Sequence, residues 1–288
     1  MAKPRAKKAD SSAGEMLRAV ANKILTDANA ALQNGELATS AAIHDFRKAL
    51  KRWRALLRLL EPWLGAAGEK LRHEARDLAR ELNSPRDAQA ALDALVDAVK
   101  RARDFSPALT PKIRASIEDL RAQAEGATLT DEMRMRIEGY LGVASRSVER
   151  WRIGGVKSAE IATRLKKAYR RARSRLPDDW HKTEGDDLHE LRRRVIEYRY
   201  QMELAAPLWP RFARTAIEDA QSLRDRLGRY QDLTVLSALT RPRQPLAAWR
   251  SRLAPLIAAR QSLHLKHAAR FGRRLFAERP GAFRRRLA

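Results

Sequence analysis

IHDFRKALKRWRALLRLL, from Ile43 to Leu60, sets two patterns side by side on one predicted helix. Apolar residues recur in alternating steps of three and four, the spacing of a buried helical seam. They are Ile43, Phe46, Leu50, Trp53, Leu57 and Leu60, continued by Leu64. The same steps recur one residue further round, at His44, Arg47, Lys51, Arg54 and Arg58. We therefore predict a basic stripe, about 21 Å long at the rise of an α-helix, along the edge of the seam.

Like charges repel each other along this helix. Arg47 and Lys51 are four residues apart, as are Arg54 and Arg58, and Lys48 and Arg52 form a third such pair beside them. Each pair costs about 0.2–0.5 kcal/mol. A stripe that borders the seam points towards a groove between helices, where water screens charge less. We interpret it as a site for an anion that supplies the missing counter-charge. The simpler alternative is a solvated basic face.

The whole chain is basic. Its 288 residues include 59 Lys and Arg against 35 Asp and Glu, a net charge of +24. Such a charge attracts polyanions, so nucleic acid, an anionic membrane surface and a polyphosphate-like polymer are candidate partners. Cysteine is absent, which excludes disulfides and thiolate metal sites. No apolar run approaches the roughly 18 residues of a membrane span, and no signal peptide is visible. We expect a disordered basic tail at residues 1–13 and a cytoplasmic protein.

The fold is predicted to be all-α, because apolar spacing of three and four residues runs through almost the whole chain. An offset of 145 residues aligns the chain with itself and pairs His44 with His189. We therefore predict one domain over residues 14–288. It consists of two similar helical halves, approximately 14–152 and 157–288, that pack about a pseudo-two-fold axis.

The same offset pairs Asp87, in LNSPRD (82–87), with Asp232, in LGRYQD (227–232). Both stretches contain turn-forming residues, so a turn is predicted at each. The two aspartates are equally well explained as N-caps of the helices that follow, a position that favours Asp.

The second copy of the basic motif is weaker. In LHELRRRVIEYRYQMEL (188–204) the stripe keeps His189, Arg192 and Arg199, but Ile196 and Glu203 stand where the first copy has Lys51 and Arg58. We expect this half to bind an anion less tightly. A third basic stretch, LKKAYRRARSRL (165–176), borders its own apolar face with Lys166, Lys167, Arg170, Arg171 and Arg173.

With these motifs in this order, the sequence resembles the CHAD (conserved histidine α-helical domain) family. The resemblance rests on both His motifs, the Arg-rich stretch before the second one, and the turns that contain Asp87 and Asp232; it covers essentially the whole chain after the tail. It implies two four-helix bundles around a basic channel that binds inorganic polyphosphate, and an association with polyphosphate granules. The Glu-x-Glu-x-Lys strand of the triphosphate-processing domain found in many members is absent.

The resemblance also implies which residues line the channel. They are His44, Arg47, Lys48, Lys51, Arg54, His189, Arg192, Arg193 and Arg199, joined by Lys166, Arg170 and Arg173. Arg58, Lys167 and Arg171 extend the stripes and complete the predicted polyphosphate-binding set. Sulfate or phosphate is expected to occupy the same channel, nucleic acid to bind only non-specifically, and no cofactor is expected.

Other chemistries have less support. His264 and His267 lie three residues apart, but no carboxylate or thiolate set accompanies them, so a metal site is not predicted. His44 and His189 could also be buried structural histidines. No nucleophile motif or phosphate-binding glycine loop is present, so we expect a binding protein rather than an enzyme. The alternative is a nucleic-acid binder or helical scaffold with an outward basic face; polyphosphate cleavage is a weaker third hypothesis.

Overall fold

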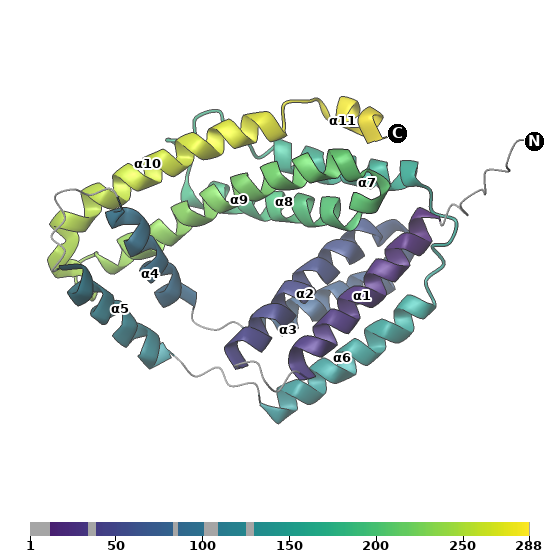
Figure 1. Cartoon of the computed structure of the whole chain (residues 1–288), viewed down its shortest axis with the longest axis horizontal. Helices are drawn as coiled ribbons and strands as arrows, with labels where there is room; N and C mark the ends of the chain where they lie inside the picture. The colour runs from purple at the N-terminus through teal and green to yellow at the C-terminus, as the bar shows by residue number, and fades with distance from the viewer. Residues whose placement is uncertain (1–11, 34–38, 83–85, 101–108, 125–129, 288) are drawn as a thin grey trace, which may run out of the picture.

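The computed structural model describes residues 12–33, 39–82, 86–100, 109–124 and 130–287, which form helices and their connections (Figure 1). The α-helices are α1 (Ala13–Gln33), α2 (Thr39–Leu59), α3 (Glu61–Glu81), α4 (Arg86–Val99), α5 (Leu109–Ala124), α6 (Asp131–Glu149), α7 (Ser158–Arg173), α8 (Gly185–Leu204), α9 (Pro210–Leu239), α10 (Arg250–Leu275) and α11 (Pro280–Leu287). Two 3-10 turns, η1 (Ala206–Leu208) and η2 (Ala247–Trp249), precede α9 and α10. These residues contain no strand, which confirms the predicted all-α fold. Residues 1–11 of the predicted tail lie outside the described residues, whereas Ser12 accepts a hydrogen bond from the Glu15 N–H and Ala13 begins α1.

The first bundle consists of α1, α2, α3 and α6, which pack side by side (Figure 1). The predicted seam of α2 is buried from Ile43 to Leu60, and Leu64 is partly buried. Trp53 joins three of these helices, because its indole N–H donates to the Tyr140 hydroxyl of α6 at 2.6 Å. The hydroxyl in turn donates to the Leu71 carbonyl of α3 at 2.8 Å. A buried polar chain with every member bonded fixes one arrangement of the helices.

Two glycines permit the backbone geometry of this bundle. A Cβ atom on Gly14 would lie 1.6 Å from the Ile153 carbonyl oxygen, so the start of α1 can approach the α6–α7 connection only without a side chain. Gly65 has a φ of 55°, in the region that glycine adopts without strain, and it kinks α3 after its first turn. Arg18 of α1 donates to the carbonyls of Val148 and Trp151 at the end of α6.

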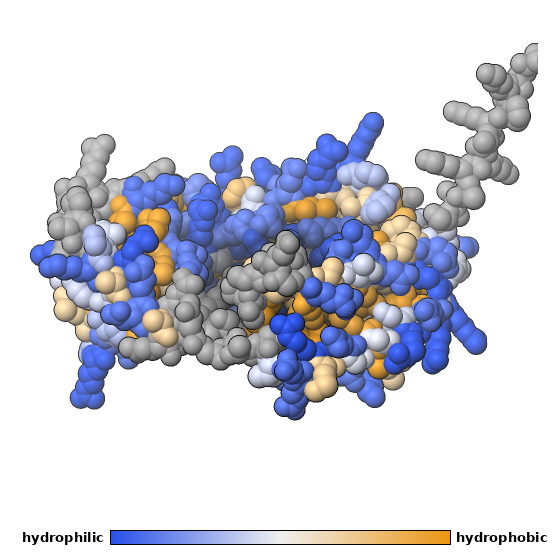
Figure 2. All heavy atoms as spheres, turned by 60° about the horizontal axis from the view of Figure 1, so that its bottom comes forward, coloured by the Kyte–Doolittle hydropathy of each residue, from blue (hydrophilic) through white to orange (hydrophobic). Residues whose placement is uncertain are grey.

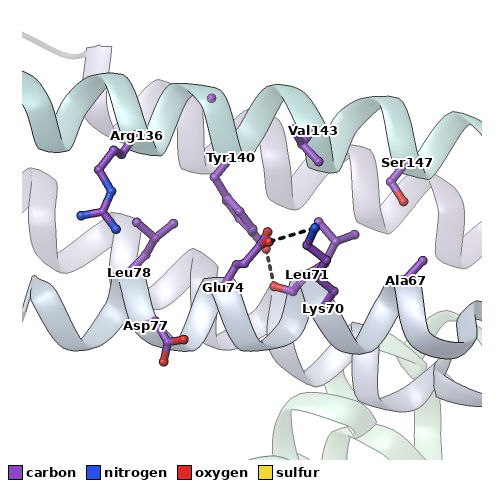
Figure 3. Close-up of a pocket in the computed structure, with 11 residues that line it drawn as sticks. Ala67, Lys70, Leu71, Glu74, Asp77, Leu78, Arg136, Tyr140, Val143 and Ser147 are labelled. Carbon is purple, nitrogen blue, oxygen red and sulfur yellow. Dashed lines mark hydrogen bonds and ion pairs between the residues drawn. The ribbon is translucent and has the colours of Figure 1, made fainter.

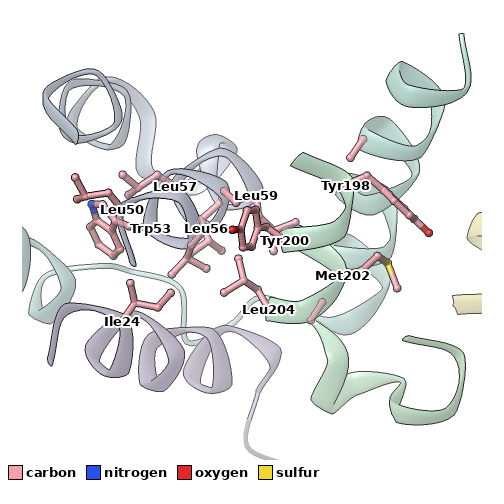
Figure 4. Packing of buried hydrophobic residues seen from close by; sticks show 14 of the residues in the cluster. Ile24, Leu50, Trp53, Leu56, Leu57, Leu59, Tyr198, Tyr200, Met202 and Leu204 are labelled. Atoms are coloured by element: carbon pink, nitrogen blue, oxygen red, sulfur yellow. The ribbon is translucent and has the colours of Figure 1, made fainter. Parts of the chain in front are cut away.

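The second bundle consists of α7, α8, α9 and α10, and α11 packs on α7. Its predicted seam is buried at Leu188, Leu191, Val195, Tyr198 and Met202. One apolar core runs through both bundles, because α2 packs directly on α8. Figure 4 shows this junction, where Leu56 and Leu59 of α2 approach Tyr200 and Leu204 of α8. Leu59 and Leu204 are 145 residues apart and belong to the same core, so equivalent positions of the two copies both lie at this junction. The pseudo-two-fold axis itself stays a prediction.

The repeat holds for some helices and not for others. The starts of α1 and α7 are 145 residues apart, and those of α2 and α8 are 146 apart. The counterparts of α3 and α4, however, are one continuous helix, α9. The turn predicted at LGRYQD is therefore wrong, and Asp232 lies inside α9 rather than at an N-cap. The first copy has Pro85 where the second has Tyr230, and proline disfavours helix at the residue before it. Asp87 is the second residue of α4, and its side chain lies outside the described part.

Helices α4 and α5 belong to the first half in sequence but pack elsewhere. They build a second, smaller core with α9 and α10 at the end of the molecule away from α1 and α6 (Figure 1). A polar cluster supports this core. Asp97 of α4 pairs with Arg260 of α10 and lies 2.7 Å from Nε2 of His264, which is fully buried. The Nδ1 atom of His264 lies 3.4 Å from the guanidinium of Arg226 on α9.

This cluster predicts that acid loosens the attachment of α4. Burial lowers the pKa of His264, and Asp97 opposes this effect in part. Burial alone would raise the pKa of Asp97, but hydrogen bonds from Arg260 and His264 together outweigh it, so the pKa of Asp97 is lowered. Both groups bind protons more readily when unfolded, so acid destabilises the folded state. The effect of His264 begins as pH falls below about 6.5, the ordinary value for histidine, and that of Asp97 only below about 3.8. We expect His264→Gln to reduce the dependence of thermal stability on pH between neutral and mildly acidic conditions. An unchanged slope in a melting series would contradict this assignment.

Candidate polyanion-binding site

Arg54 is a half-buried cation in the middle of the α2 basic stripe, and no carboxylate of the described residues pairs with it. Burial is the largest cause that lowers its pKa, and other arginines add to this effect: Arg58 on the same helix, and Arg72, Arg76 and Arg80 on α3. An arginine stays protonated even so. Arg54 therefore folds without a carboxylate partner of its own among the described residues, although the arginines around it are ion-paired.

The three arginines of α3 were not among the sequence-predicted site residues. Arg72, Arg76 and Arg80 are spaced four residues apart in RHEARDLAR (72–80), so they lie on one side of α3. Acidic neighbours conceal this pattern in the sequence, since Glu69 pairs with Arg72 and Asp77 lies near both Arg76 and Arg80. The four-residue spacing of these arginines indicates a basic side of α3, but their acidic neighbours make the local net charge appear balanced.

The remaining α2 residues extend the basic face towards both ends. His44, Lys48 and Lys51 are exposed, and Arg47 is half-buried. Arg58, near the end of the helix, is ion-paired, with its Nη1 atom 3.2 Å from Glu197 of α8. The six predicted α2 residues thus share one continuous face, which we call the α2 basic face.

The four predicted site residues on α8 make different contacts. His189 is exposed and its Nδ1 atom lies 2.7 Å from the Gln231 amide nitrogen of α9, so it is not a buried histidine. Arg192 packs over Gly228 of α9, where a Cβ atom would come within 3.3 Å of its guanidinium. Arg199 is buried, stacks 4.3 Å above the Tyr200 ring and pairs with Glu203. Arg193 pairs with Glu190 and is exposed.

Glu203 is a carboxylate placed among cations. Burial raises its pKa, although four neighbouring charges act in the opposite direction: Arg199, Arg52, Lys48 and Arg224. These neighbours come from α8, α2 and α9, so Glu203 marks the place where the α2 basic face approaches the second bundle. Aligning the two copies of the basic motif places Glu203 where the first copy has the cation Arg58. The structure shows which cations Glu203 partly neutralises.

The cations of α7 do not form one site. Arg171 and Lys167 lie on the side that faces α2 and α8, with Arg171 3.8 Å from Glu197 and Lys167 near Glu61. Lys166, Arg170 and Arg173 lie about a third of a helical turn round. Arg173 donates to the Phe276 carbonyl at the end of α10, at 3.0 Å. The structure therefore brings Arg171 to the α2 basic face and assigns Arg173 a structural contact elsewhere.

Glu197 joins the three basic helices. It contacts Arg58 of α2 at 3.2 Å, Arg194 of α8 at 3.4 Å and Arg171 of α7 at 3.8 Å. One of its oxygens, Oε1, is buried and has no hydrogen-bond partner among the described residues. Arg194 also pairs with Glu190 at 2.7 Å, so Glu197 is chiefly the shared carboxylate of Arg58 and Arg171 at this end of the α2 basic face.

We expect Glu197→Gln to lower stability and raise anion affinity together. Arg58 and Arg171 would lose their shared counter-charge, and Arg194 would keep only Glu190, at a cost of about 1–3 kcal/mol of folding free energy. An anionic ligand would no longer compete with a carboxylate of the protein and should bind several-fold more tightly. Thermal unfolding and calorimetric titration of the same sample measure both effects. If stability and affinity fell together, Glu197 would act only as a structural tie.

One of the two histidines considered for a metal, His264, has a structural role. His264 is held in the Asp97 cluster described above, and the described residues contain no group of three His, Cys, Asp or Glu placed to hold a metal ion. No helix in the described part of the chain is long and apolar enough to cross a membrane. Figure 2 shows hydrophilic side chains over much of one face of the molecule, with smaller apolar areas between them.

A pocket between α3 and α6 lies in the same bundle but has a different character. It measures about 620 Å³ and is lined by apolar groups that include Leu71, Leu78 and Val143 (Figure 3). The Tyr140 hydroxyl at its base already has two partners. Nothing in this pocket resembles a site for a polyanion, so we do not include it in the candidate site.

Comparison with known proteins agrees with the fold. The CHAD domain family matches residues 15–241 of this chain. The structure is similar to that of PptA from Streptomyces chartreusis, with a TM-score of 0.68, 18% identity and coverage of 92% of this chain and 99% of the other. It is also similar to the CHAD domain from the plant Ricinus communis, with a TM-score of 0.54, 19% identity and coverage of 99% and 95%. No curated protein matches the sequence significantly. Because the family match spans most of the chain, the protein belongs to the CHAD domain family.

Proposed function

We propose that this protein binds inorganic polyphosphate along the α2 basic face and the adjoining arginines of α3, α7 and α8. The observation that carries the proposal is Arg54, a half-buried cation without a carboxylate partner among the described residues, surrounded by four further arginines. Such an arrangement is unfavourable in the free protein. It becomes favourable when a polyanion enters, and the resemblance to the CHAD family implies polyphosphate as that polyanion.

The chemistry of the side chains suits a chain of linked phosphates. Guanidinium groups present paired N–H donors that match phosphate oxygens, and lysines add mobile point charges. Cations that recur along a helix about every 5 Å to 6 Å can contact successive phosphates of an extended polymer. In this proposal the protein holds the polymer without cleaving it and resides at polyphosphate granules. Free phosphate or sulfate would occupy single positions with low affinity.

A nucleic-acid-binding protein is the alternative. Proteins that bind single strands usually present aromatic platforms on which bases stack. All six tryptophans of this chain are buried or half-buried, which gives little support to such a platform. Binding to duplex phosphates alone would be non-specific and would not need a half-buried arginine such as Arg54.

A competition experiment separates the two functions. Labelled long-chain polyphosphate is bound to the protein at physiological salt and displaced by unlabelled polyphosphate or duplex DNA of equal total charge. We expect polyphosphate to displace the label at much lower concentration, and both affinities to fall as salt rises because counterions are released. The polymer should keep its length during incubation. Equal displacement by DNA would favour the nucleic-acid alternative, and shortened polymer would indicate cleavage.

A further inference from the structure

Two apolar side chains of α6 are exposed on the outside of the first bundle. Helix α6 lies at the outer edge of this bundle and packs on α1 and α3 through its buried side (Figure 1). Met135 and Val143 lie outside that contact and are 66% and 47% exposed, two of the three large apolar side chains that are exposed in the described part of the chain. Val143 also lines the pocket between α3 and α6 (Figure 3), so these side chains extend an apolar surface. Such surfaces mark interaction sites.

The exposed side of α6 repeats the spacing of a buried seam. Alternating steps of three and four residues join Glu132, Met135, Gly139, Gly142 and Arg146. At 3.6 residues per turn, these five residues lie opposite the side that α6 buries. Together with Val143 beside them, we call them the outer face of α6.

A glycine lies at the centre of the outer face. A Cβ atom on Gly139 would have no neighbour within 4 Å, so no contact within the described residues requires a glycine there. Glycine weakens the interior of a helix but lets another backbone approach closely. Gly139 is therefore better explained by a second helix that packs against α6 than by the contacts within this chain.

The charge of this region differs from that of the rest of the protein. Residues 131–150 carry four acidic and four basic side chains, whereas the whole chain has a net charge of +24. Two copies of so basic a protein repel each other over most of their surfaces, and a neutral region is where this repulsion is weakest. An acidic partner would be attracted to the basic helices instead. Charge therefore favours a second copy of this chain as the occupant of the outer face.

The outer face is also complementary to itself when two copies run antiparallel. A two-fold axis at Gly139 brings together positions that are equally far from this residue along the helix. Glu132 then lies opposite Arg146, seven residues to either side, and Met135 lies opposite Val143, four residues to either side. One register thus joins opposite charges and joins the two exposed apolar side chains. Neither Glu132 nor Arg146 forms an ion pair within the described residues.

We propose that this protein forms a two-fold dimer through the outer faces of antiparallel α6 helices. The two copies of Gly139 meet at the axis, and Met135 of each copy packs against Val143 of the other. Glu132 of each copy pairs with Arg146 of the other, so every contact occurs twice. A helix pair about 28 Å long buries less than the roughly 1,200 Å² of most stable complexes, so the dissociation constant lies in the micromolar range. The interface does not include the α2 basic face, and the dimer forms without polyphosphate.

Sedimentation equilibrium of the full chain at physiological salt, without polyphosphate, tests the dimer. We expect the mass to rise from 32.7 kDa towards twice that value as protein concentration increases from about 1 μM to about 300 μM. Gly139→Arg places two cations against each other at the axis and should weaken association by about a hundred-fold or more. The monomer should fold as before, because the new side chain meets only open space.

Gly185→Arg is the matched control. It makes the same exchange at a glycine on α8 that also faces open space, and it should associate like the unsubstituted protein. Melting curves of both variants check that the fold is kept. A monomer at every concentration, or equal association of the two variants, would overturn the proposal.

A charge exchange tests the register. Glu132→Arg and Arg146→Glu each place like charges together twice in the dimer, and each should weaken association by about tenfold. The double variant restores both pairs with their signs reversed and should associate like the unsubstituted protein. If the double variant associates no better than the single variants, these residues do not face each other and the proposed antiparallel arrangement is wrong.

Discussion

Replacing Arg47, Lys51 and Arg54 with Gln is expected to weaken polyphosphate binding by about a hundred-fold or more. These residues occupy three successive positions of the α2 basic face. Each charge-assisted hydrogen bond to phosphate is worth about 1.5–3 kcal/mol, and 1.4 kcal/mol corresponds to a factor of ten in affinity. Calorimetric titration with a polyphosphate of defined length measures the loss.

A matched control separates charge location from charge total. Arg241, Arg250 and Arg252 are exposed, lie around η2 and the start of α10, and form no ion pair within the described residues. Replacing all three with Gln changes the net charge equally but leaves the α2 basic face intact. We expect only a small loss of affinity in this variant. Equal losses in the two triple variants would mean diffuse attraction to a basic surface and would support the nucleic-acid alternative.

The same reasoning gives an unusual expectation for stability. Arg54→Gln alone should keep or raise the melting temperature of the free protein, since it removes a cation repelled by its neighbours. Relief of like-charge pairs is worth about 0.2–0.5 kcal/mol each. A clear fall in the melting temperature would show that Arg54 makes a stabilising contact and would weaken the argument from missing counter-charge.

Chain length is expected to have an effect of similar size. Long-chain polyphosphate should bind at least about a hundred-fold more tightly than triphosphate or ATP, because a short ligand contacts only part of a stripe that extends for about 21 Å. Calorimetry across a series of lengths, at one salt concentration, measures this dependence. Affinity should rise with polymer length until one chain covers the basic face. For longer polymers, the affinity for each bound chain should then stay constant.

Equal affinity for ATP and the long polymer would contradict the extended site. It would indicate a pocket for one or two phosphates, of the kind that a few arginines around Glu197 could form. The Glu197→Gln variant distinguishes this outcome, because a small local site should respond to it strongly while an extended site should respond only several-fold.

Helical periodicity predicted most of the fold. The seam residues of α2 and α8 are buried where the spacing of apolar residues placed them. The error at LGRYQD has a simple cause, since a glycine and turn-forming neighbours are tolerated inside α9 when packing on both sides holds the helix. The position of α4 and α5 on the second bundle could not be predicted, because the apolar face of α4 shows that it packs but not against which helix.

The candidate site was predicted in part. The α2 basic face follows directly from the sequence pattern, whereas the α3 arginines were overlooked because acidic neighbours balance them. The different roles of Arg171 and Arg173 depend on which helices flank α7, which spacing alone does not reveal. The sequence likewise marked Glu203 as a departure from the stripe, but only the structure shows that buried Arg199 pairs with it.

The position of the bound polymer is the claim on which this account depends most. Lysine acetylation followed by mass spectrometry tests this position on the protein without substitutions, in the presence and absence of long-chain polyphosphate. Lys48 and Lys51 lie on the α2 basic face, and exposed Lys157 and Lys266 lie away from it on the α6–α7 connection and α10. We predict strong protection of Lys48 and Lys51 and little protection of the other two. Equal protection of all four lysines would contradict a defined polyphosphate site on α2.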